Sequence, residues 1–93
     1  MAVTVRIPTP LRKLTNEQDT VIAEQDGTLG QLIDTLEGQF PGLKERLCDE
    51  TGELRRFVNV YINGEDVRFL SGLETNIDAG AEVSIVPAVA GGA

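Results

Sequence analysis

The sequence predicts one α+β domain, in which a mixed sheet of four or five strands packs on one main helix. Three observations support this prediction: strand-like alternation near both ends of the chain, one amphipathic segment with helix-start and helix-stop signals, and an Asn-Gly pair between two strand-like segments. The chain has 93 residues, enough for one domain. We place this domain at residues 1–87 and expect residues 88–93 to form a flexible tail.

The N-terminal part of the chain predicts two strands that pair across a long loop. Apolar and polar side chains alternate in residues 2–8, which is typical of a half-buried strand. Residues 8–19 are rich in turn-forming and charged residues, so we expect a loop there, and residues 20–24 are short and β-branched like a second strand. The residues of the first strand that are expected to face the core are Val3, Val5 and Ile7.

The clearest helix begins after Thr28. Thr28 is expected to be its N-cap, and Gln31 completes a capping box. Pro41 and Gly42 end the helix, and residues 43–54 contain one more helical turn followed by a loop. The apolar face of the main helix comprises Leu29, Leu32, Ile33, Leu36 and Phe40.

The C-terminal half predicts a hairpin and a final strand. Residues 56–69 form the hairpin around Asn63 and Gly64, because both positions accept positive φ. A turn-rich segment precedes the last strand, residues 82–87. The expected core residues of this half are Val58, Val60, Ile62, Leu73, Ile77, Val83 and Ile85. One helix crossing one face of a mixed sheet makes an α+β roll.

Composition excludes several classes of partner. The net charge of −7 disfavours nucleic acid and anionic membranes, and it suits a partner protein with a basic groove. No apolar run approaches the roughly 20 residues of a membrane span, and no signal-peptide pattern is visible. We therefore expect a cytoplasmic protein that is a monomer on its own.

Catalytic chemistry is not predicted. The chain has no His and a single cysteine, Cys48, so it lacks the commonest general base and the usual ligands of a zinc site. The acidic pairs Asp49-Glu50 and Glu65-Asp66 are expected to be solvated surface, because adjacent side chains diverge. Cys48 is expected to be a small apolar residue or an exposed bystander. We expect no catalytic residues, no metal and no bound cofactor.

The tail is the feature that composition does not explain. The last strand continues into AVAGGA, with Gly91 and Gly92 before Ala93. From Ala88 to Gly92 an extended chain reaches about 17 Å. Because glycine lacks Cβ, a Gly-Gly end can thread a channel that is too narrow for other residues. From the residues alone, both a disordered end and a carboxylate presented to an enzyme remain open.

Residues 58–92, VNVYINGEDVRFLSGLETNIDAGAEVSIVPAVAGG, resemble the C-terminal half of bacterial sulfur-carrier proteins. That family includes the carrier of thiamine synthesis and the small subunit of molybdopterin synthase. The stretches NVYINGEDVRF, GLETNIDAGAEV and IVPAVAGG are most similar to the CysO branch, which feeds cysteine synthesis. A weaker resemblance covers AVTVRIPTPLRKLT and TLGQLIDTLEGQF. The resemblance implies a β-grasp, or ubiquitin-like, fold.

The resemblance also implies a carrier rather than an enzyme. An adenylyltransferase of the ubiquitin-activating type would activate the Gly92 carboxylate with ATP, and sulfur transfer would give a C-terminal thiocarboxylate. Gly91 would give the partner enzymes access to it. A sulfur-accepting synthase, similar to a cysteine synthase, would receive the sulfur, with molybdopterin, thiamine or a secondary metabolite as other destinations.

Ala93 departs from the family pattern, which ends at the second glycine. Some carriers with extra C-terminal residues resemble this case and are trimmed by a zinc metalloprotease of the JAMM type, so the resemblance implies a processing site at the bond between Gly92 and Ala93. Two other functions remain open: a ubiquitin-like modifier joined by isopeptide bonds to lysines, and a plain binding subunit. For partner docking we predict Phe57, Tyr61 and Val86, on the face opposite the core.

Overall fold

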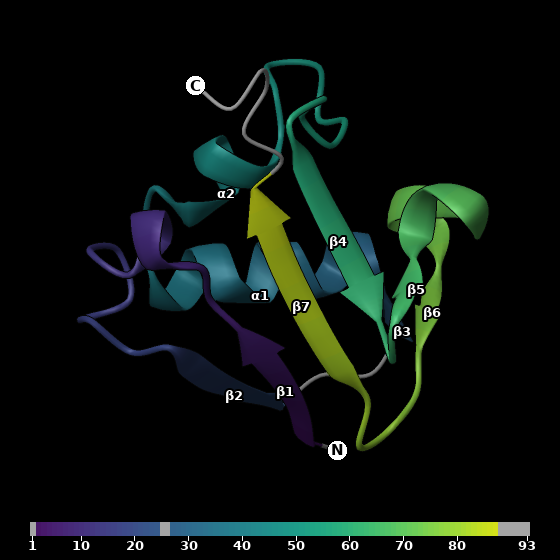
Figure 1. Cartoon of the computed structure of the whole chain (residues 1–93), viewed down its shortest axis with the longest axis horizontal. Helices are drawn as coiled ribbons and strands as arrows, with labels where there is room; N and C mark the ends of the chain where they lie inside the picture. The colour runs from purple at the N-terminus through teal and green to yellow at the C-terminus, as the bar shows by residue number, and fades with distance from the viewer. Residues whose placement is uncertain (1, 25–26, 88–93) are drawn as a thin grey trace.

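The computed structural model describes residues 2–24 and 27–87, in which helix α1 (Leu29–Gln39) lies across one face of a five-stranded sheet (Figure 1). The strand order is β2-β1-β7-β4-β5. In the middle of the sheet, β1 (Ala2–Arg6) and β7 (Glu82–Pro87) run parallel, and the other neighbouring strands are antiparallel. This mixed sheet on one main helix is the predicted α+β roll.

The N-terminal hairpin forms as predicted, but its connection is more ordered than a plain loop. Strand β2 (Thr20–Glu24) pairs with β1 over five residues. The connection contains a 3-10 turn, η1 (Thr9–Leu11), where proline at the first helical positions suits the fixed φ of its ring. Farther along, Thr15 is fully buried, and its hydroxyl donates to the carbonyl of Gln18 at 2.9 Å.

Helix α1 begins at the predicted capping box. The backbone N–H of Gln31 donates to the Thr28 hydroxyl at 3.3 Å, and the backbone N–H of Thr28 donates to the side-chain oxygen of Gln31 at 2.9 Å. The helix ends at Gln39, so Phe40 becomes its C-cap and is only partly buried against the core. The predicted extra turn is α2 (Leu43–Leu47).

The Asn-Gly hairpin is confirmed, although its second arm is short. Asn63 and Gly64 have φ of 51° and 87°, between β4 (Val58–Ile62) and β5 (Glu65–Asp66). The predicted arm continued to Phe69. Instead, the Asp66 carboxylate accepts the Arg68 N–H at 2.8 Å and starts a 3-10 turn, η2 (Val67–Phe69), which buries Val67.

A second, two-stranded sheet was not predicted. It joins β3 (Gly27–Thr28) to β6 (Asn76–Ile77), beside the 3-10 turn η3 (Gly72–Glu74). These strands are too short to show an alternating pattern. The Leu29 N–H donates to the Thr75 carbonyl at 2.9 Å, which attaches this small sheet to the start of α1.

The core lies between α1 and the sheet, and it contains the residues that the sequence predicted for it. Leu73, like Phe40, is only partly buried against it. Among residues 2–24 and 27–87, no helix has the length and apolar character needed to cross a membrane. The predicted core residues that are buried are Val3, Val5, Ile7, Leu29, Leu32, Ile33, Leu36, Val58, Val60, Ile62, Ile77, Val83 and Ile85.

Candidate functional site

The end of β7 is the base of the C-terminal tail. Pro87, the last residue of β7, pairs with Val58, the first residue of β4. At the base itself the pairing partner is β4, while β1 pairs with the earlier residues of β7, up to Ser84. Gly91, Gly92 and Ala93 lie outside the described residues, so their predicted roles stay predictions.

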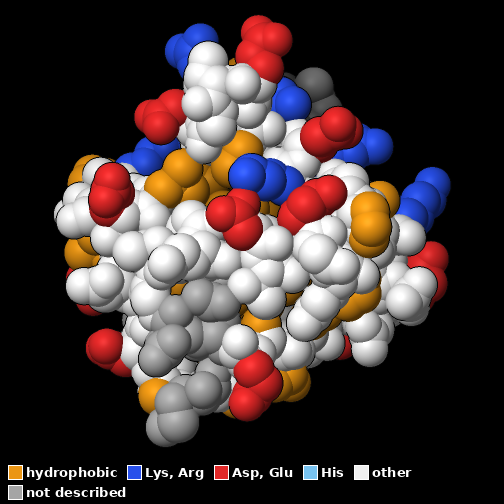
Figure 2. Space-filling model, turned by 180° about the vertical axis from the view of Figure 1, so that it is seen from behind, with side chains coloured by type: hydrophobic (Ala, Val, Ile, Leu, Met, Phe, Trp, Pro, Cys, Tyr) orange, Lys and Arg blue, Asp and Glu red, His pale blue; other side chains and the backbone are white. Residues whose placement is uncertain are grey.

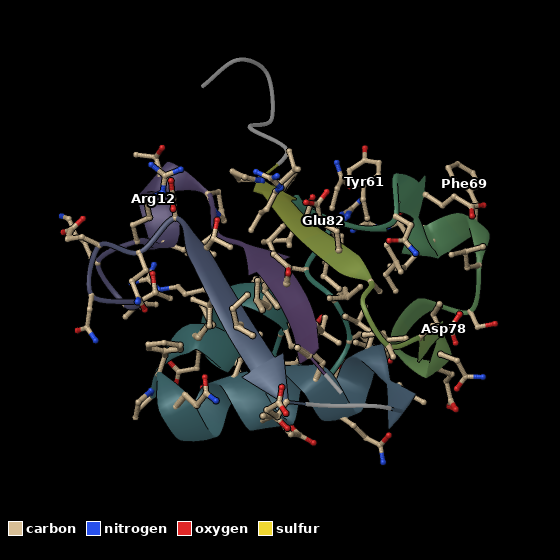
Figure 3. All side chains as sticks on the ribbon, turned by 90° about the horizontal axis from the view of Figure 1, so that it is seen from below. Arg12, Tyr61, Phe69, Asp78 and Glu82 are labelled. Carbon is tan, nitrogen blue, oxygen red and sulfur yellow. The ribbon has the colours of Figure 1, made fainter. Side chains whose placement is uncertain are left out.

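Two of the predicted docking residues, Tyr61 and Val86, lie on the face of the sheet away from α1, and Phe57 directly precedes Val58, the partner of Pro87. Val86 lies opposite Asn59 and is 41% exposed, and Tyr61 lies opposite Ser84 and is half-buried. Figure 3 shows Tyr61 pointing away from α1. Phe57 is 56% exposed and sits in the turn that immediately precedes β4.

Sequence reasoning missed a second exposed apolar pair next to this surface. Phe69 is 88% exposed at the end of η2, and Leu70, the C-cap of that turn, is 43% exposed. Figure 3 shows Phe69 on the same side of the sheet as Tyr61. The two adjacent apolar residues are visible in the sequence at the end of VRFL. They were not predicted to be exposed because the second arm of the hairpin was expected to continue to Phe69, whereas the chain leaves the sheet at η2.

A groove of about 890 Å³ opens beside the base of the tail. Its apolar wall includes Leu11, Val58, Ile85 and Pro87, and both cations and carboxylates line it as well, Arg55 among them. These residues come from three separate parts of the chain, which is why sequence patterns did not identify the groove. Val58 and Pro87 therefore border both the groove and the start of the tail.

The charged groups between the two helices stabilise the fold. The Glu37 carboxylate accepts the N–H groups of Lys44 at 2.9 Å and Gly42 at 3.1 Å, and these hydrogen bonds lower the pKa of Glu37. The Lys44 ammonium donates to Asp34 at 2.6 Å, which raises the pKa of Lys44. Each group has a structural partner, as expected for helix ends.

Cys48 is the small buried residue that one of the two interpretations predicted. Its side chain belongs to the hydrophobic core, and burial raises the pKa of its thiol, with Lys44 acting in the opposite direction. Because the thiolate is the nucleophilic form, a raised pKa disfavours nucleophilic chemistry at this position near neutral pH.

Of the two acidic pairs, Asp49-Glu50 lies at a turn and Glu65-Asp66 forms the short strand β5. The Asp49 carboxylate accepts both the hydroxyl and the N–H of Thr51, and these bonds lower the pKa of Asp49. Asp66 caps η2. Over residues 2–24 and 27–87, no group of three or more His, Cys, Asp or Glu side chains is arranged to hold a metal ion. Figure 2 shows acidic and basic side chains interspersed on the face that it presents.

Comparison with known proteins identifies the family to which the chain belongs. Residues 5–92 match the ThiS family. The chain is 54% identical to the sulfur carrier protein CysO of Mycobacterium tuberculosis over 94 residues, covering 99% of this chain and all of that one. It is 42% identical to small archaeal modifier protein 3 of Haloferax volcanii over 69 residues, covering 74% of each chain.

A solved structure agrees in fold. The complex of BexX and CysO from Amycolatopsis orientalis contains a chain that matches with a TM-score of 0.89 and 47% identity, covering 96% of this chain and 98% of that chain. This match confirms the β-grasp fold. The identity to the sulfur carrier protein CysO confirms the prediction that this chain is a carrier, which enzymes act on as a substrate. This chain therefore belongs to the ThiS family of ubiquitin-like sulfur carriers with the β-grasp fold.

Proposed function

We propose that Gly92 carries sulfur as a C-terminal thiocarboxylate and delivers it to cysteine biosynthesis in the cytoplasm. The observation that supports this most directly is the fixed base of the tail, where Pro87 on a central strand pairs with Val58. A carrier must present one terminus to several enzymes in turn. A tail that leaves the middle of a rigid sheet, rather than a loose edge, meets this need.

The proposed loading takes two steps. First, the Gly92 carboxylate attacks the α-phosphate of ATP on a ubiquitin-activating-type adenylyltransferase, pyrophosphate leaves, and an acyl-adenylate remains. Second, hydrosulfide delivered by a partner protein attacks the acyl carbon, AMP leaves with the electron pair of the acyl–oxygen bond, and loss of the sulfur-bound proton gives a thiocarboxylate. Cys48 is not needed in either step, because the new bond forms at the Gly92 carboxyl carbon.

A sulfur-accepting synthase of the cysteine synthase type is the proposed recipient. Molybdopterin, thiamine and a secondary metabolite are other destinations for the sulfur. High identity to CysO over the whole chain supports the cysteine destination. The relative from Amycolatopsis orientalis forms a complex with BexX, which supports a carrier that works by docking on a partner protein.

Ala93 has to be removed before loading in this proposal, since the carboxylate that reacts belongs to Gly92. A zinc metalloprotease of the JAMM type would hydrolyse the Gly92–Ala93 bond. ATP is the only nucleotide required, and it is bound by the activating enzyme rather than by this chain.

Protein modification is the second candidate function. It is supported by the identity to small archaeal modifier protein 3. Both functions share the activation step, and they differ only in the acceptor, which is a sulfur-receiving enzyme in one case and a lysine amine in the other. A plain binding subunit would not be activated at all.

Mass spectrometry of the protein recovered from its own cells tests these functions together. The expected product ends at Gly92, lacks Ala93 and has one oxygen of the terminal carboxyl group replaced by sulfur. Gly92 joined through an isopeptide bond to lysines of other proteins would favour the modifier. A chain that is never processed or altered, even under sulfur limitation, would overturn the carrier proposal and leave the binding subunit.

A further inference from the structure

The side chain of Arg68 lies against the turn that displays Phe57. This turn spans Arg55 to Val58 and is closed by the Val58 N–H, which donates to the Arg55 carbonyl at 3.1 Å. Arg56 and Phe57 are its two central residues, so the position of the Phe57 ring depends on how firmly the turn is held.

Arg68 binds both ends of this turn. Its Nη2 donates to the carbonyls of Arg55 and Val58, each at 2.8 Å, with a longer contact of 3.3 Å to the Arg56 carbonyl. Its Nη1 donates to the side chain of Asn59, the next residue of β4. One planar guanidinium therefore satisfies acceptors on successive residues of the turn and of β4.

The position of Arg68 is itself fixed. Its backbone N–H donates to the Asp66 carboxylate at 2.8 Å, at the start of η2. Asp66 in turn pairs with Tyr61 across the hairpin. The guanidinium thus connects the end of the hairpin to its beginning, because its acceptors lie 9 to 13 residues earlier in the chain.

We propose that Arg68 is a positioning residue for partner docking: it clasps the Arg55–Val58 turn and thereby fixes Phe57 beside the base of the tail. The role rests on the proposed function, because it assumes that Phe57 contacts the activating enzyme. Lysine cannot replace arginine here, since a single ammonium cannot reach the Asn59 oxygen and the turn carbonyls in the same planar arrangement. Holding Phe57 in place before binding reduces the entropy lost on docking.

The first test measures, without any enzyme, how firmly Arg68 holds the Arg55–Val58 turn. Amide hydrogen exchange of Val58 is compared in the full chain, in Arg68→Lys and Arg68→Ala, and in Lys13→Ala, which removes one exposed positive charge elsewhere. We expect exchange at Val58 to rise by about tenfold or more in both Arg68 variants. The rate should stay unchanged in Lys13→Ala. Unchanged exchange at Val58 in the Arg68 variants would show that Arg68 does not hold the Arg55–Val58 turn, and would overturn the proposal.

The second test measures loading of chains ending at Gly92. Pyrophosphate exchange by the cognate adenylyltransferase is measured for the parent, Arg68→Ala, Phe57→Ala and the double variant. We expect Arg68→Ala to raise the KM for the carrier by about tenfold with kcat little changed. In the Phe57→Ala background, the same change should add less than about twofold, because the residue acts through Phe57.

The outcomes separate the two hypotheses. Equal effects of Arg68→Ala in both backgrounds would mean that Arg68 contacts the enzyme directly or acts through general destabilisation, and would overturn the positioning role. A parent chain that the enzyme never adenylates would instead overturn the proposed function, together with any role of Arg68 in loading. In that case the exchange measurement still decides whether Arg68 holds the turn.

Discussion

The Glu37 carboxylate accepts the backbone N–H of Lys44 at 2.9 Å, which joins the last turn of α1 to the first turn of α2. The same carboxylate accepts the N–H of Gly42, at the N-cap of α2, where φ is 98°. One acidic side chain thus satisfies two N–H groups at a helix start that would otherwise lack partners. This arrangement makes the connection between the two helices dependent on pH.

We expect Glu37→Gln to destabilise the protein near neutral pH and to matter less in acid. The folded-state pKa of Glu37 lies below its ordinary value, so the ionised carboxylate contributes stability above an unfolded pKa of about 4.3. That contribution is lost as the pH falls through the lowered folded value. Urea unfolding midpoints of parent and variant should therefore differ at pH 7, and the difference should shrink as the pH falls below the ordinary glutamate pKa and through the lowered folded value. Glu50→Gln, at an exposed position, controls for the lost charge, and a pH-independent difference would contradict the mechanism.

Leu32→Ala should cost about 2–5 kcal/mol of unfolding free energy, through the cavity that it leaves. Leu32 is fully buried on the face of α1 that packs on the sheet. Denaturant unfolding measures the loss, and Gln39→Ala, at an exposed position of the same helix, is the control. Coincident midpoints for Leu32→Ala and the parent would show that this side chain does not support the core.

Val86→Asp should weaken binding of the activating enzyme by about tenfold or more while the fold is retained. The substitution places a charge on the exposed apolar surface beside the base of the tail. Binding is measured by titration calorimetry with the purified enzyme. Ile22→Asp is a matched control, because Ile22 is also exposed but lies on the edge strand β2. Equal affinity of Val86→Asp and the parent would remove Val86 from the docking surface.

Cys48→Ser and Cys48→Ala should both leave sulfur loading unaffected. The thiol is buried in the core, and its raised pKa keeps it protonated near neutral pH. Thiocarboxylate formation is followed by mass spectrometry under single-turnover conditions. If both variants remain folded and neither can be loaded, sulfur passes through Cys48 and the assignment of Gly92 as the only sulfur-bearing position fails.

Removal of Ala93 should be required for activation. One additional residue displaces the terminal carboxylate by up to about 3.8 Å, whereas reaction needs the attacking atom within about 3–3.5 Å of its target. Pyrophosphate exchange should therefore be much slower for the chain ending at Ala93 than for the chain ending at Gly92. A Gly92→Ala chain without Ala93 separates chain length from the added methyl group. Equal rates for the first two chains would make processing unnecessary.

Local patterns predicted most of the fold, because they depend on neighbouring residues. Thr28 and Gln31 form the capping box that their spacing indicates, and Asn63 and Gly64 form the expected turn. The early end of β5 was missed because alternation cannot reveal that Asp66 caps a 3-10 turn instead of extending the strand. Pairing of the short strands β3 and β6 depends on distant contacts that have no local signal.

The site was predictable only in part, for the same physical reason. Alternation placed Tyr61 and Val86 on the outer face correctly, since strand periodicity determines which face a side chain occupies. The clasp by Arg68 joins residues that are up to 13 positions apart, and nothing in the sequence around Arg68 distinguishes it from an ordinary surface arginine. Such contacts become visible only when the hairpin closes.

The parallel pairing of β1 with β7 has a mechanical consequence. A partner that pulls on the tail applies force at Pro87 along the axis of β7, whose ladders to β1 and β4 lie on either side. The ladder hydrogen bonds run across the strands, so this force loads them in shear, and they must break together instead of one after another. In the proposed function, this resistance keeps β7 in the sheet while an enzyme handles the terminus, so that the carrier stays folded from one partner to the next.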